Sequence, residues 1–378
     1  MKLEIGQSVK TADRLPNRGL LHRQLNSRMQ YTFKQKLGAI AFDAPRYEWW
    51  LRRHWIRIRN RNERLVEAPA GCGVACQWRW TSDLHVTNVF PSLGTRLMKQ
   101  ATGEWPIVFA DAPSEHGRDV QVSFVIGHRG MQRVPHLLAT LATVAAQQGI
   151  GIECIVVEQS ARSEIRDVLP SWVRHVHTPL PVPDLPYCRS WTLNVGARIA
   201  SGKVLVFHDN DMLVPEAYAT EIWKRYVEGY EVINLKRFVF YLTENHSQEI
   251  ASSHWLSLAH PPEVIVQNLE AGGSVAMTRD AFVAIGGYDE SFVGWGGEDN
   301  EFWDRAQTRR VWPYAYLPIV HLWHAPQPEK LQARPATTEY YRRRSELSVE
   351  TRIAELSARN FGNAGQLDPP WTSAPRNS

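Results

Sequence analysis

Short apolar runs alternate with amphipathic stretches from residue 120 onward. Residues 120–128 (VQVSFVIGH), 152–160 (IECIVVEQS) and 203–211 (KVLVFHDND) are apolar and rich in β-branched side chains, which is typical of buried strands. Residues 131–149 and 190–202, between them, have the spacing of helices. Strands that alternate with helices predict an α/β fold with a mainly parallel sheet and helices on both faces.

Polar side chains end these three strands. His128 ends the first, Glu158 lies near the end of the second, and Asp209 and Asp211 end the third. Because ligands bind beyond the carboxyl ends of parallel strands, we expect these side chains to share one edge where a ligand binds.

Three further helical segments follow. Pro215 suits the first turn of a helix over residues 215–230. Thr278 is a candidate N-cap, and Gly286 a candidate stop, for a short helix. The charged residues after position 330 predict surface helix followed by a Pro-rich tail.

The change of pattern along the chain predicts three parts. Residues 1–117 mix polar, aromatic and basic segments whose pattern indicates no particular fold. Residues 118–328 form the α/β domain, and residues 329–378 form a C-terminal helical tail.

Composition limits the kinds of partner. The 378 residues include 43 Lys and Arg against 39 Asp and Glu, a formal charge of +4. This balance is too mild to indicate nucleic acid as the main partner, although a phosphorylated small molecule is compatible with it. Four irregularly spaced cysteines favour a reducing cytoplasm over a disulfide framework.

Membrane contact is open to two interpretations. No apolar run reaches the roughly 20 residues of a membrane span, and the N-terminus lacks the apolar core of a signal peptide. Residues 47–65 (YEWWLRRHWIRIRNRNERL) interleave aromatic residues with Arg and could lie on anionic headgroups as a peripheral contact. The alternative is a solvated basic face with its Trp side chains packed inward.

A metal site is one interpretation of two short motifs. Asp209 and Asp211, in HDND, could hold a divalent ion that bridges a diphosphate, although many such loops are solvated turns. His321 and His324, in HLWH, would usually be structural histidines. Taken with the aspartates, they suit Mn²⁺ better than Ca²⁺.

Other nucleotide and metal motifs do not fit. The segment GARIASG lacks the G-x-G-x-x-G fingerprint, and the chain contains no Walker A motif. Cys72 and Cys76 lack a second pair of ligands, which argues against a structural zinc site.

Three segments, in order, resemble one known family. They are YCRSWTLNVGARIASGKVLVFHDNDM, EAGGSVAMTRDAFVAIGGYDESFVGWGGEDNEFWDRA and HLWH. Together they resemble the GT-A glycosyltransferases, in particular the β-1,4-galactosyltransferase type and its bacterial family 2 and chondroitin-polymerase relatives. The resemblance covers residues 120–326. The joint pattern of R-x4-N-x-G, D-x-D, G-W-G-G-E-D and a late His is more specific than any one element.

This resemblance implies a GT-A (Rossmann-like) fold and a metal-dependent, inverting glycosyltransferase. Such an enzyme would move a sugar from a UDP-sugar to a hydroxyl of a saccharide or glycoconjugate acceptor, forming a β-linkage. Gly127, His128, Arg129 and Glu158 would then hold the uridine part of the donor. Arg189 would approach the diphosphate.

The same resemblance implies a metal set. Asp209 would lie by the ribose and the metal, which would be Mn²⁺ or Mg²⁺. Asp211 and His324 would bind the metal directly. His321 sits where the galactosyltransferases carry a second, softer ligand.

The acceptor side is implied in the same way. Gly272 and Gly273 would let the backbone pass close to the donor. Trp295 would stack on the acceptor sugar, Glu298 would hydrogen-bond it, and Asp299 would be the catalytic base. The neighbouring glycines would let this loop close over the donor, and the helix dipole would keep Asp299 ionised.

Two departures and two alternatives stay open. Asn300 replaces an acid of the galactosyltransferases, and Glu270 lies near a position that helps to choose the donor sugar there, so the donor sugar is undetermined. A retaining transferase of the polypeptide N-acetylgalactosaminyl type shares W-G-G-E but carries Asn where this chain has Asp299. The other alternative is a non-catalytic nucleotide-sugar binder.

Overall fold

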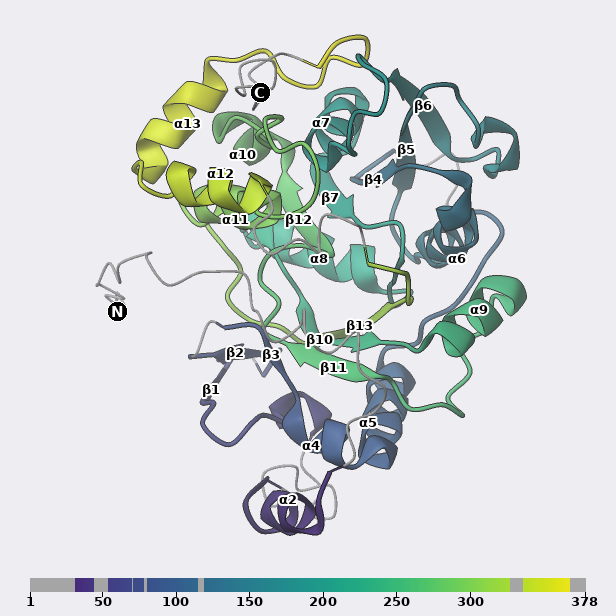
Figure 1. Ribbon diagram of the computed structural model, residues 1–378, viewed down its shortest axis with the longest axis vertical. Helices are drawn as coiled ribbons and strands as arrows, with labels where there is room; N and C mark the ends of the chain where they lie inside the picture. Colours follow the sequence, from purple (N-terminus) through teal and green to yellow (C-terminus); the bar gives the residue numbers. More distant parts are fainter. Residues whose placement is uncertain are drawn as a thin grey trace.

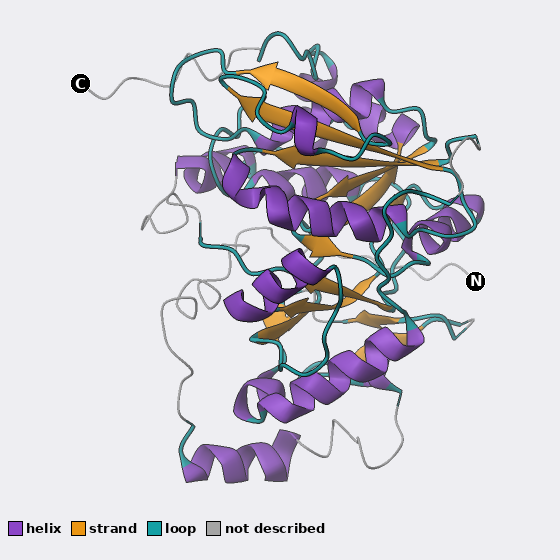
Figure 2. Cartoon of the chain, turned by 90° about the vertical axis from the view of Figure 1, so that its right-hand side faces the viewer, coloured by secondary structure: helices purple, strands orange, loops and turns teal. Residues whose placement is uncertain are grey.

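The computed structural model describes residues 31–43, 54–69, 71–77, 80–114, 119–326 and 336–367. Within these residues the strands form a six-stranded sheet, a five-stranded sheet and a two-stranded ribbon. Figures 1 and 2 show the two larger sheets one above the other, with helices packed around each.

The six-stranded sheet has the order β6-β5-β4-β7-β12-β9. Its first four strands pair in parallel, whereas β12 pairs antiparallel with β7 and β9. The strands are β4 (Val122–His128), β5 (Ile152–Ser160), β6 (Arg174–Pro179), β7 (Val204–His208), β9 (Val232–Ile233) and β12 (Ser274–Thr278). The predicted class, an α/β fold with a mixed, mainly parallel sheet flanked by helices, is confirmed.

Helices cover both faces of this sheet because successive strand residues point to opposite sides. On β4, Phe124 packs in the cluster beneath α6, and Val125 packs in the cluster beneath α7. Gly196 brings α7 very close to β4, since a Cβ there would lie 2.3 Å from Val125 Cγ1. The helical elements around the sheet are η4 (Met131–Arg133), α6 (Val134–Ala145), η5 (Arg166–Val168), α7 (Arg189–Ile199), α8 (Tyr218–Val227), α10 (Arg279–Ala284) and α11 (Glu298–Ala306).

The predicted helix signals hold at α10. The Thr278 hydroxyl accepts a hydrogen bond from the backbone of the first turn, and Gly286 follows the helix with φ +80°. Helix α8 begins at Tyr218 rather than at Pro215, because residues 215–217 form a turn before it.

The five-stranded sheet was not predicted from the sequence. Its order is β3-β11-β10-β13-β8, and only β10 and β13 pair in parallel. Its strands are β3 (Ser82–Asp83), β8 (Met212–Leu213), β10 (Lys236–Tyr241), β11 (Val264–Gln267) and β13 (Leu317–His321). Strand β8 follows β7 after three residues, so the two sheets meet at the carboxyl edge of the six-stranded sheet.

Much of the N-terminal region packs on this second sheet. Strand β3 pairs with β11, and helix α5 shares a core with β10 and β13. Figure 1 shows α4 and α5 below β11. The elements here are α2 (Phe33–Gly38), η2 (Ala39–Asp43), η3 (Trp55–Arg57), β1 (Leu65–Glu67), β2 (Val74–Cys76), α4 (His85–Val89) and α5 (Pro91–Glu104), with α9 (Glu244–Ser253) from the later chain.

The aromatic and basic segment 47–65 is described only in part, because residues 47–53 lie outside the described residues. Trp55 is buried against Phe238, and its Nε1 donates to Glu104 Oε2 at 2.6 Å. This Trp therefore packs inward, as the alternative interpretation has it. Among the described residues, no helix combines the length and the apolar character needed to cross a bilayer.

Helices α12 (Ala336–Arg344) and α13 (Val349–Ser357) follow the second sheet in the chain. The prediction of charged surface helix is wrong for their inner faces. Arg352 is 2% exposed and Arg344 is 8% exposed, because both pack toward acidic side chains on and before α11. Figure 1 shows both helices beside α11 and α10.

Candidate active site

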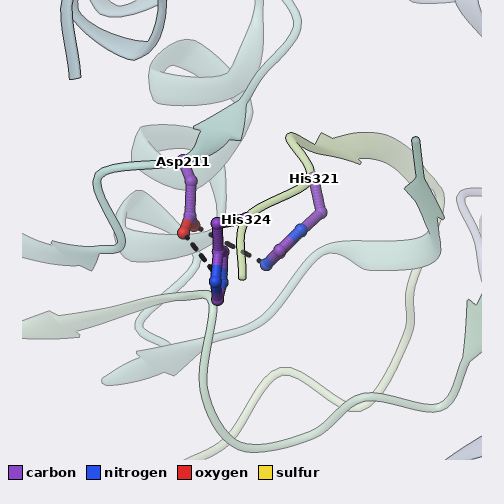
Figure 3. Close-up of side chains that lie close together, drawn as sticks. All are labelled: Asp211, His321 and His324. Atoms are coloured by element: carbon purple, nitrogen blue, oxygen red, sulfur yellow. Dashed lines mark ion pairs between the residues drawn. The ribbon is translucent and has the colours of Figure 1, made fainter. Parts of the chain in front are cut away.

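Three predicted metal ligands meet where the two sheets join (Figure 3). Asp211 lies between β7 and β8, and His321 ends β13. The pairing of β8 with β13 sets Met212 opposite His321, which brings the two segments together. His324 Nε2 is 3.4 Å from Asp211 Oδ2, and His321 Nε2 is 3.7 Å from Asp211 Oδ1.

The charges around Asp211 favour its ionised form. Burial alone would raise its pKa, but His321, His324 and Arg133 outweigh burial and lower the pKa to about 2. Arg133, which the sequence did not indicate, donates to Asp211 Oδ2 at 2.7 Å. Burial lowers the pKa of His321 to about 4, so this imidazole is neutral near pH 7.

The donor set fits a divalent cation. One ligand atom from each of Asp211, His321 and His324 lies within 4.8 Å of the other two. Among the described residues, Asp211 Oδ1 and His321 Nδ1 are buried without a hydrogen-bond partner. An ionised carboxylate beside a neutral imidazole is a combination that Mn²⁺ and similar metals accept.

A second group of predicted residues is joined by Arg189, at the start of α7. Its guanidinium contacts Asp209 Oδ1 through NH2 at 2.7 Å and Asp299 Oδ1 through NH1 at 2.7 Å. Asp209 and Asp299 lie 90 positions apart in the chain, yet one side chain spans both. Arg189 thus connects the end of β7 with the start of α11.

Two glycines keep the space beside these acids open. Gly272 has φ +78°, and a Cβ there would lie 2.7 Å from Asp299 Oδ2. The carbonyl of Gly273, at φ +70°, accepts a hydrogen bond from the Asp209 backbone at 2.8 Å. Side chains at these positions would be strained, and a Cβ at Gly273 would lie 2.9 Å from Met212 Cε, so glycine is required at both.

The loop before α11 carries the remaining predicted residues. Gly294, Gly296 and Gly297 all have positive φ, between +91° and +106°. The backbone N–H of Gly296 donates to Glu298 Oε2 at 3.1 Å. Glu298 and Asp299 form the first turn of α11, and Trp295 lies half-buried just before them.

The protonation of these acids differs from the expectation. Burial, helped by the charge of Asp299, raises the pKa of Glu298 to about 7. Burial also raises the pKa of Asp299, although the Arg189 charge opposes this. The helix start alone therefore does not set the protonation of Asp299, because the desolvation of a buried carboxylate is larger than a helix-dipole effect.

The residues predicted for uridine lie at the same edge, but they already have protein partners. His128 is fully buried, with Asn210 Nδ2 at 2.9 Å from its Nδ1 and the Gly130 carbonyl 3.0 Å from its Nε2. Burial lowers its pKa to about 4. Arg129 donates to the carbonyl of Leu185 at 2.6 Å.

Gly127 and Glu158 are enclosed even more tightly. A Cβ on Gly127 would lie 2.2 Å from the Tyr187 hydroxyl, so the side of this residue is filled. Glu158 accepts hydrogen bonds from two Ser hydroxyls and the Glu164 backbone, with His175 Nε2 at 2.9 Å. These four partners occupy the usual acceptor positions of a carboxylate. A direct ligand role for Glu158 would require one of them to be replaced.

Lys236, on β10, is a site residue that the sequence reasoning missed. It is 3% exposed, and its Nζ donates to the carbonyl of Ser274 at 2.5 Å. Burial lowers its pKa to about 7, although the nearby charges of Asp299 and Asp209 oppose the shift. A lysine inside the apolar run NLKRFVFYL was the available signal.

One family model matches the part of the chain that carries the loop before α11 and its two acids. Residues 266–317 match the model described as the N-terminal domain of galactosyltransferase. The match runs from β11 into β13 and includes Gly272, Gly273, Trp295, Glu298 and Asp299. The chain is related to the galactosyltransferase-type glycosyltransferases.

Two relatives of this chain are both named validoxylamine A glucosyltransferase. Each is 25% identical over 207 aligned residues, and each alignment covers 46% of this chain. The alignments cover 48% of the protein from Streptomyces hygroscopicus subsp. jinggangensis and 45% of that from subsp. limoneus. The chain thus spans about half the length of these relatives.

A solved glycosyltransferase structure also matches. It is the catalytic domain of Drosophila β1,4-galactosyltransferase 7 in complex with xylobiose, at 17% sequence identity. The match covers 59% of this chain and 79% of that chain, with a TM-score of 0.34.

Proposed function

We propose that the protein is a metal-dependent, inverting glycosyltransferase that moves a sugar from a UDP-sugar to a hydroxyl of a saccharide or glycoconjugate, forming a β-linkage. One observation carries this proposal. Arg189 contacts both Asp209, two residues before the metal-compatible Asp211, and Asp299, the candidate base. A donor diphosphate near Asp209 and an acceptor hydroxyl near Asp299 would therefore lie on either side of the Arg189 guanidinium.

Each residue has a chemical task in this scheme. Asp211, His321 and His324 would hold the cation, which when bound supplies positive charge to the departing diphosphate. Arg189 adds a second positive charge at the same place. It contacts Oδ1 of Asp299, which leaves Oδ2 to accept the proton of the acceptor hydroxyl. Glu298 and Trp295 orient the acceptor.

The alternatives make different demands on the same residues. A retaining transferase would not need a base at Asp299, and a binder would not need the Arg189 bridge between both acids. The donor sugar stays undetermined by these contacts. Glu270, near the position expected to choose it, accepts a hydrogen bond from Trp303 Nε1 at 3.1 Å.

Location is a separate part of the proposal. A cytoplasmic enzyme is compatible with four cysteines that are not joined in disulfides, Cys72, Cys76, Cys154 and Cys188. A peripheral membrane contact through residues 47–65 is part of the proposal, without Trp55, which is buried.

Metal-dependent UDP release tests the function. The protein is incubated with UDP-glucose, UDP-galactose, UDP-N-acetylglucosamine and UDP-N-acetylgalactosamine, with Mn²⁺ or with a chelator, and with p-nitrophenyl β-glycosides as acceptors. We expect UDP release that needs the metal, and a β-linked product by NMR. An α-linked product would support the retaining alternative, and binding without UDP release would support the binder.

A further inference from the structure

The loop that carries Trp295 is held from outside the α/β domain by helix α12. The Thr337 hydroxyl donates a hydrogen bond to the carbonyl of Trp295 itself. Tyr341, one turn later, packs so closely that a Cβ on Gly297 would lie 2.9 Å from its Cβ. The Tyr340 ring meets Phe292 edge-on, with centroids 4.8 Å apart. Three side chains of one helix thus contact one loop.

Such a support has a physical purpose. Gly294, Gly296 and Gly297 all adopt positive φ, and glycine moves among backbone conformations more easily than other residues. The sequence of the loop alone therefore does not select one conformation. The hydrogen bond from Thr337 fixes the carbonyl of Trp295 between these glycines, and thereby fixes the direction in which the indole leaves the backbone.

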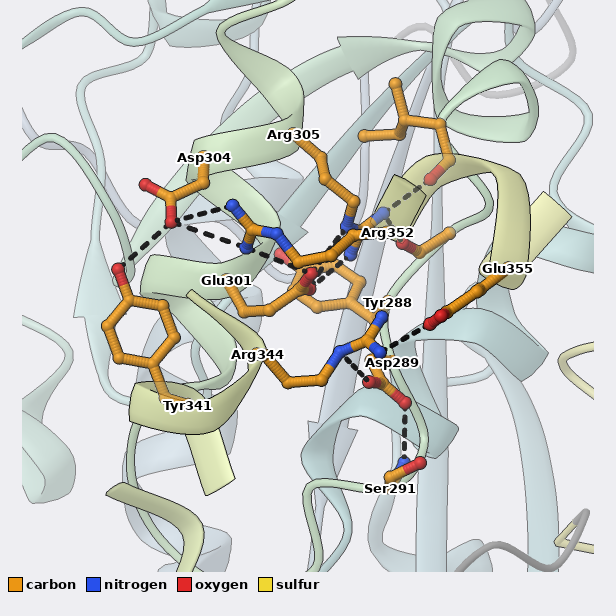
Figure 4. Close-up of polar contacts among 12 residues, drawn as sticks. Tyr288, Asp289, Ser291, Glu301, Asp304, Arg305, Tyr341, Arg344, Arg352 and Glu355 are labelled. Carbon is orange, nitrogen blue, oxygen red and sulfur yellow. Dashed lines mark hydrogen bonds and ion pairs between the residues drawn. The ribbon is translucent and has the colours of Figure 1, made fainter. Parts of the chain in front are cut away.

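Helix α12 is itself anchored by a buried ionic network (Figure 4). The Tyr341 hydroxyl donates to Asp304 Oδ2 at 3.0 Å, and Arg352 of α13 lies 3.3 Å from the same oxygen. Arg352 also faces Glu301, which pairs with Arg305 at 2.6 Å. Two acids and two arginines thus balance one another in the interior, but only when α13 is in place.

A second set of contacts anchors the chain segment before the loop. Asp289 accepts a hydrogen bond from the Tyr340 hydroxyl at 2.9 Å and lies 3.8 Å from Arg344 Nε. Arg344 in turn contacts Glu355 of α13. The C-terminal helices therefore hold both ends of the loop that carries Trp295, which we call the acceptor loop. They hold one end through Asp289 and the other through α11.

We infer that Thr337 is a positioning residue for the acceptor site, and that the C-terminal helices set the geometry of Trp295, Glu298 and Asp299. This inference rests on the proposed function, in which that loop binds the acceptor. Thr337 acts through the Trp295 carbonyl and not on the donor. Its loss should weaken the use of acceptor while the metal and donor half stays intact.

The test compares three variants. Thr337→Val keeps the shape of the side chain and removes its hydroxyl, whereas Thr337→Ser keeps the hydroxyl. Thr338→Val is the matched control, because the neighbouring Thr338 hydroxyl has no hydrogen-bond partner among the described residues. Hydrogen exchange of a peptide spanning residues 292–300 reports on the loop without any ligand. Peptides from β4 and β7 report on the sheet.

For Thr337→Val we expect roughly 5-fold faster exchange in the loop peptide, the scale of one net hydrogen bond. Exchange in β4 and β7 should not change. The KM for the best p-nitrophenyl β-glycoside should rise by a similar factor, with Mn²⁺-dependent UDP release in water unchanged. Thr337→Ser should restore both values, and Thr338→Val should match the wild type.

The outcomes separate this inference from the proposed function. Unchanged loop exchange in Thr337→Val, or an equal change in Thr338→Val, would overturn the inference even if the enzyme transfers sugar. Faster loop exchange with an unchanged acceptor KM would also overturn it, because the loop would then not set acceptor binding. A wild type without metal-dependent UDP release would reject the function, while loop exchange would still decide whether Thr337 holds the loop.

Discussion

Two acidic centres lie at the carboxyl edge of the six-stranded sheet, and their surroundings shift their pKa values in opposite directions. Asp211 is surrounded by Arg133, His321 and His324, which lower its pKa to about 2. Glu298 has a second acid beside it, and burial raises its pKa to about 7. Burial acts on both centres, so the neighbouring charges decide the difference. Asp211 stays ionised near pH 7, as a carboxylate that binds a cation should. Glu298 can gain and lose a proton near pH 7, as a group that takes part in proton transfer should.

The two centres also differ in how the backbone supports them. Asp211 and His321 sit on paired strands, whose register fixes their positions. Glu298 and Asp299 follow a loop with three glycines at positive φ. The first centre is held by the core, and the second depends on helices α12 and α13. A perturbation of the C-terminal helices should therefore affect the second centre, Glu298 and Asp299, before the first.

The largest effect is expected from Asp299→Asn. The amide keeps the size of the side chain but cannot take a proton from the acceptor hydroxyl. We expect kcat for transfer to fall by about 10²-fold or more, the scale of general-base loss, with little change in UDP-sugar binding measured by calorimetry. Asp280→Asn, an exposed acid in the first turn of α10, is the control. Full activity in Asp299→Asn would contradict the role of this centre in proton transfer.

The next effect is expected from His324→Ala. It removes one candidate metal ligand and leaves Glu298 and Asp299 unchanged. We expect Mn²⁺ affinity to fall on the order of 10- to 100-fold, a range known for altered metal surroundings. Calorimetry with Mn²⁺ alone measures this without relying on turnover. His260→Ala, at an exposed histidine, should bind Mn²⁺ like the wild type. Equal affinity in both variants would show that His324 is not a ligand.

The sequence indicated the six-stranded sheet but not the five-stranded sheet, for a physical reason. The strands β4, β5 and β7 showed as apolar runs, and the residues at their ends followed from parallel pairing. The short strands of the second sheet gave no such signal, because β8 has two residues and β3 has two. Lys236 enters the site on β10 of this second sheet, whereas Arg133 reaches Asp211 from η4, just after β4. Neither motif nor spacing indicates these two contacts.

The C-terminal helices show a different limit. Arg344 and Arg352 have the composition of a solvated face, with acids such as Glu346, Glu350 and Glu355 nearby in sequence. Their buried partners are Asp289, Glu301 and Asp304, 48 to 55 positions earlier in the chain. A sequence shows where charges are, but their burial depends on which distant element carries the opposite charge. Only the structure could show that these helices pack against the loop before α11.

A smaller effect is expected from Lys236→Met. This variant tests how far Asp299 and Glu298 depend on the buried lysine side chain beside them. The lowered pKa of Lys236 means that folding works against its charged form. Met fills a similar volume without this cost, so we expect an unfolding temperature equal to or above that of the wild type. Transfer should nevertheless fall, roughly 10-fold, the scale of one lost charge-assisted hydrogen bond or ion contact. Thermal unfolding and kcat/KM are measured together, and a less stable but fully active variant would contradict a functional role.

The smallest effect is a change of stability with pH at the acceptor centre. The pKa of Glu298 in the folded protein is about 7, above its value in an unfolded chain. Between these two values the folded state binds more protons than the unfolded state, so this group contributes stability at low pH that is lost as pH rises through 7. Relative to Glu298→Gln, which does not titrate, the wild-type unfolding temperature should therefore decline from about pH 4.5 to about pH 7. Each ~1 kcal/mol of this loss corresponds to roughly 1–2 °C for a chain of this length, because the entropy of unfolding grows with the number of residues.

The variant Asp299→Asn sharpens this last test. The charge of Asp299 raises the pKa of Glu298, second only to burial, so its removal should move the decline to lower pH. Calorimetric unfolding at several pH values, with wild type, Glu298→Gln and Asp299→Asn compared at equal ionic strength, gives the three curves. If the wild type and Glu298→Gln stay parallel across this range, Glu298 titrates like an exposed carboxyl. The electrostatic difference between the two acidic centres would then be smaller than their surroundings indicate.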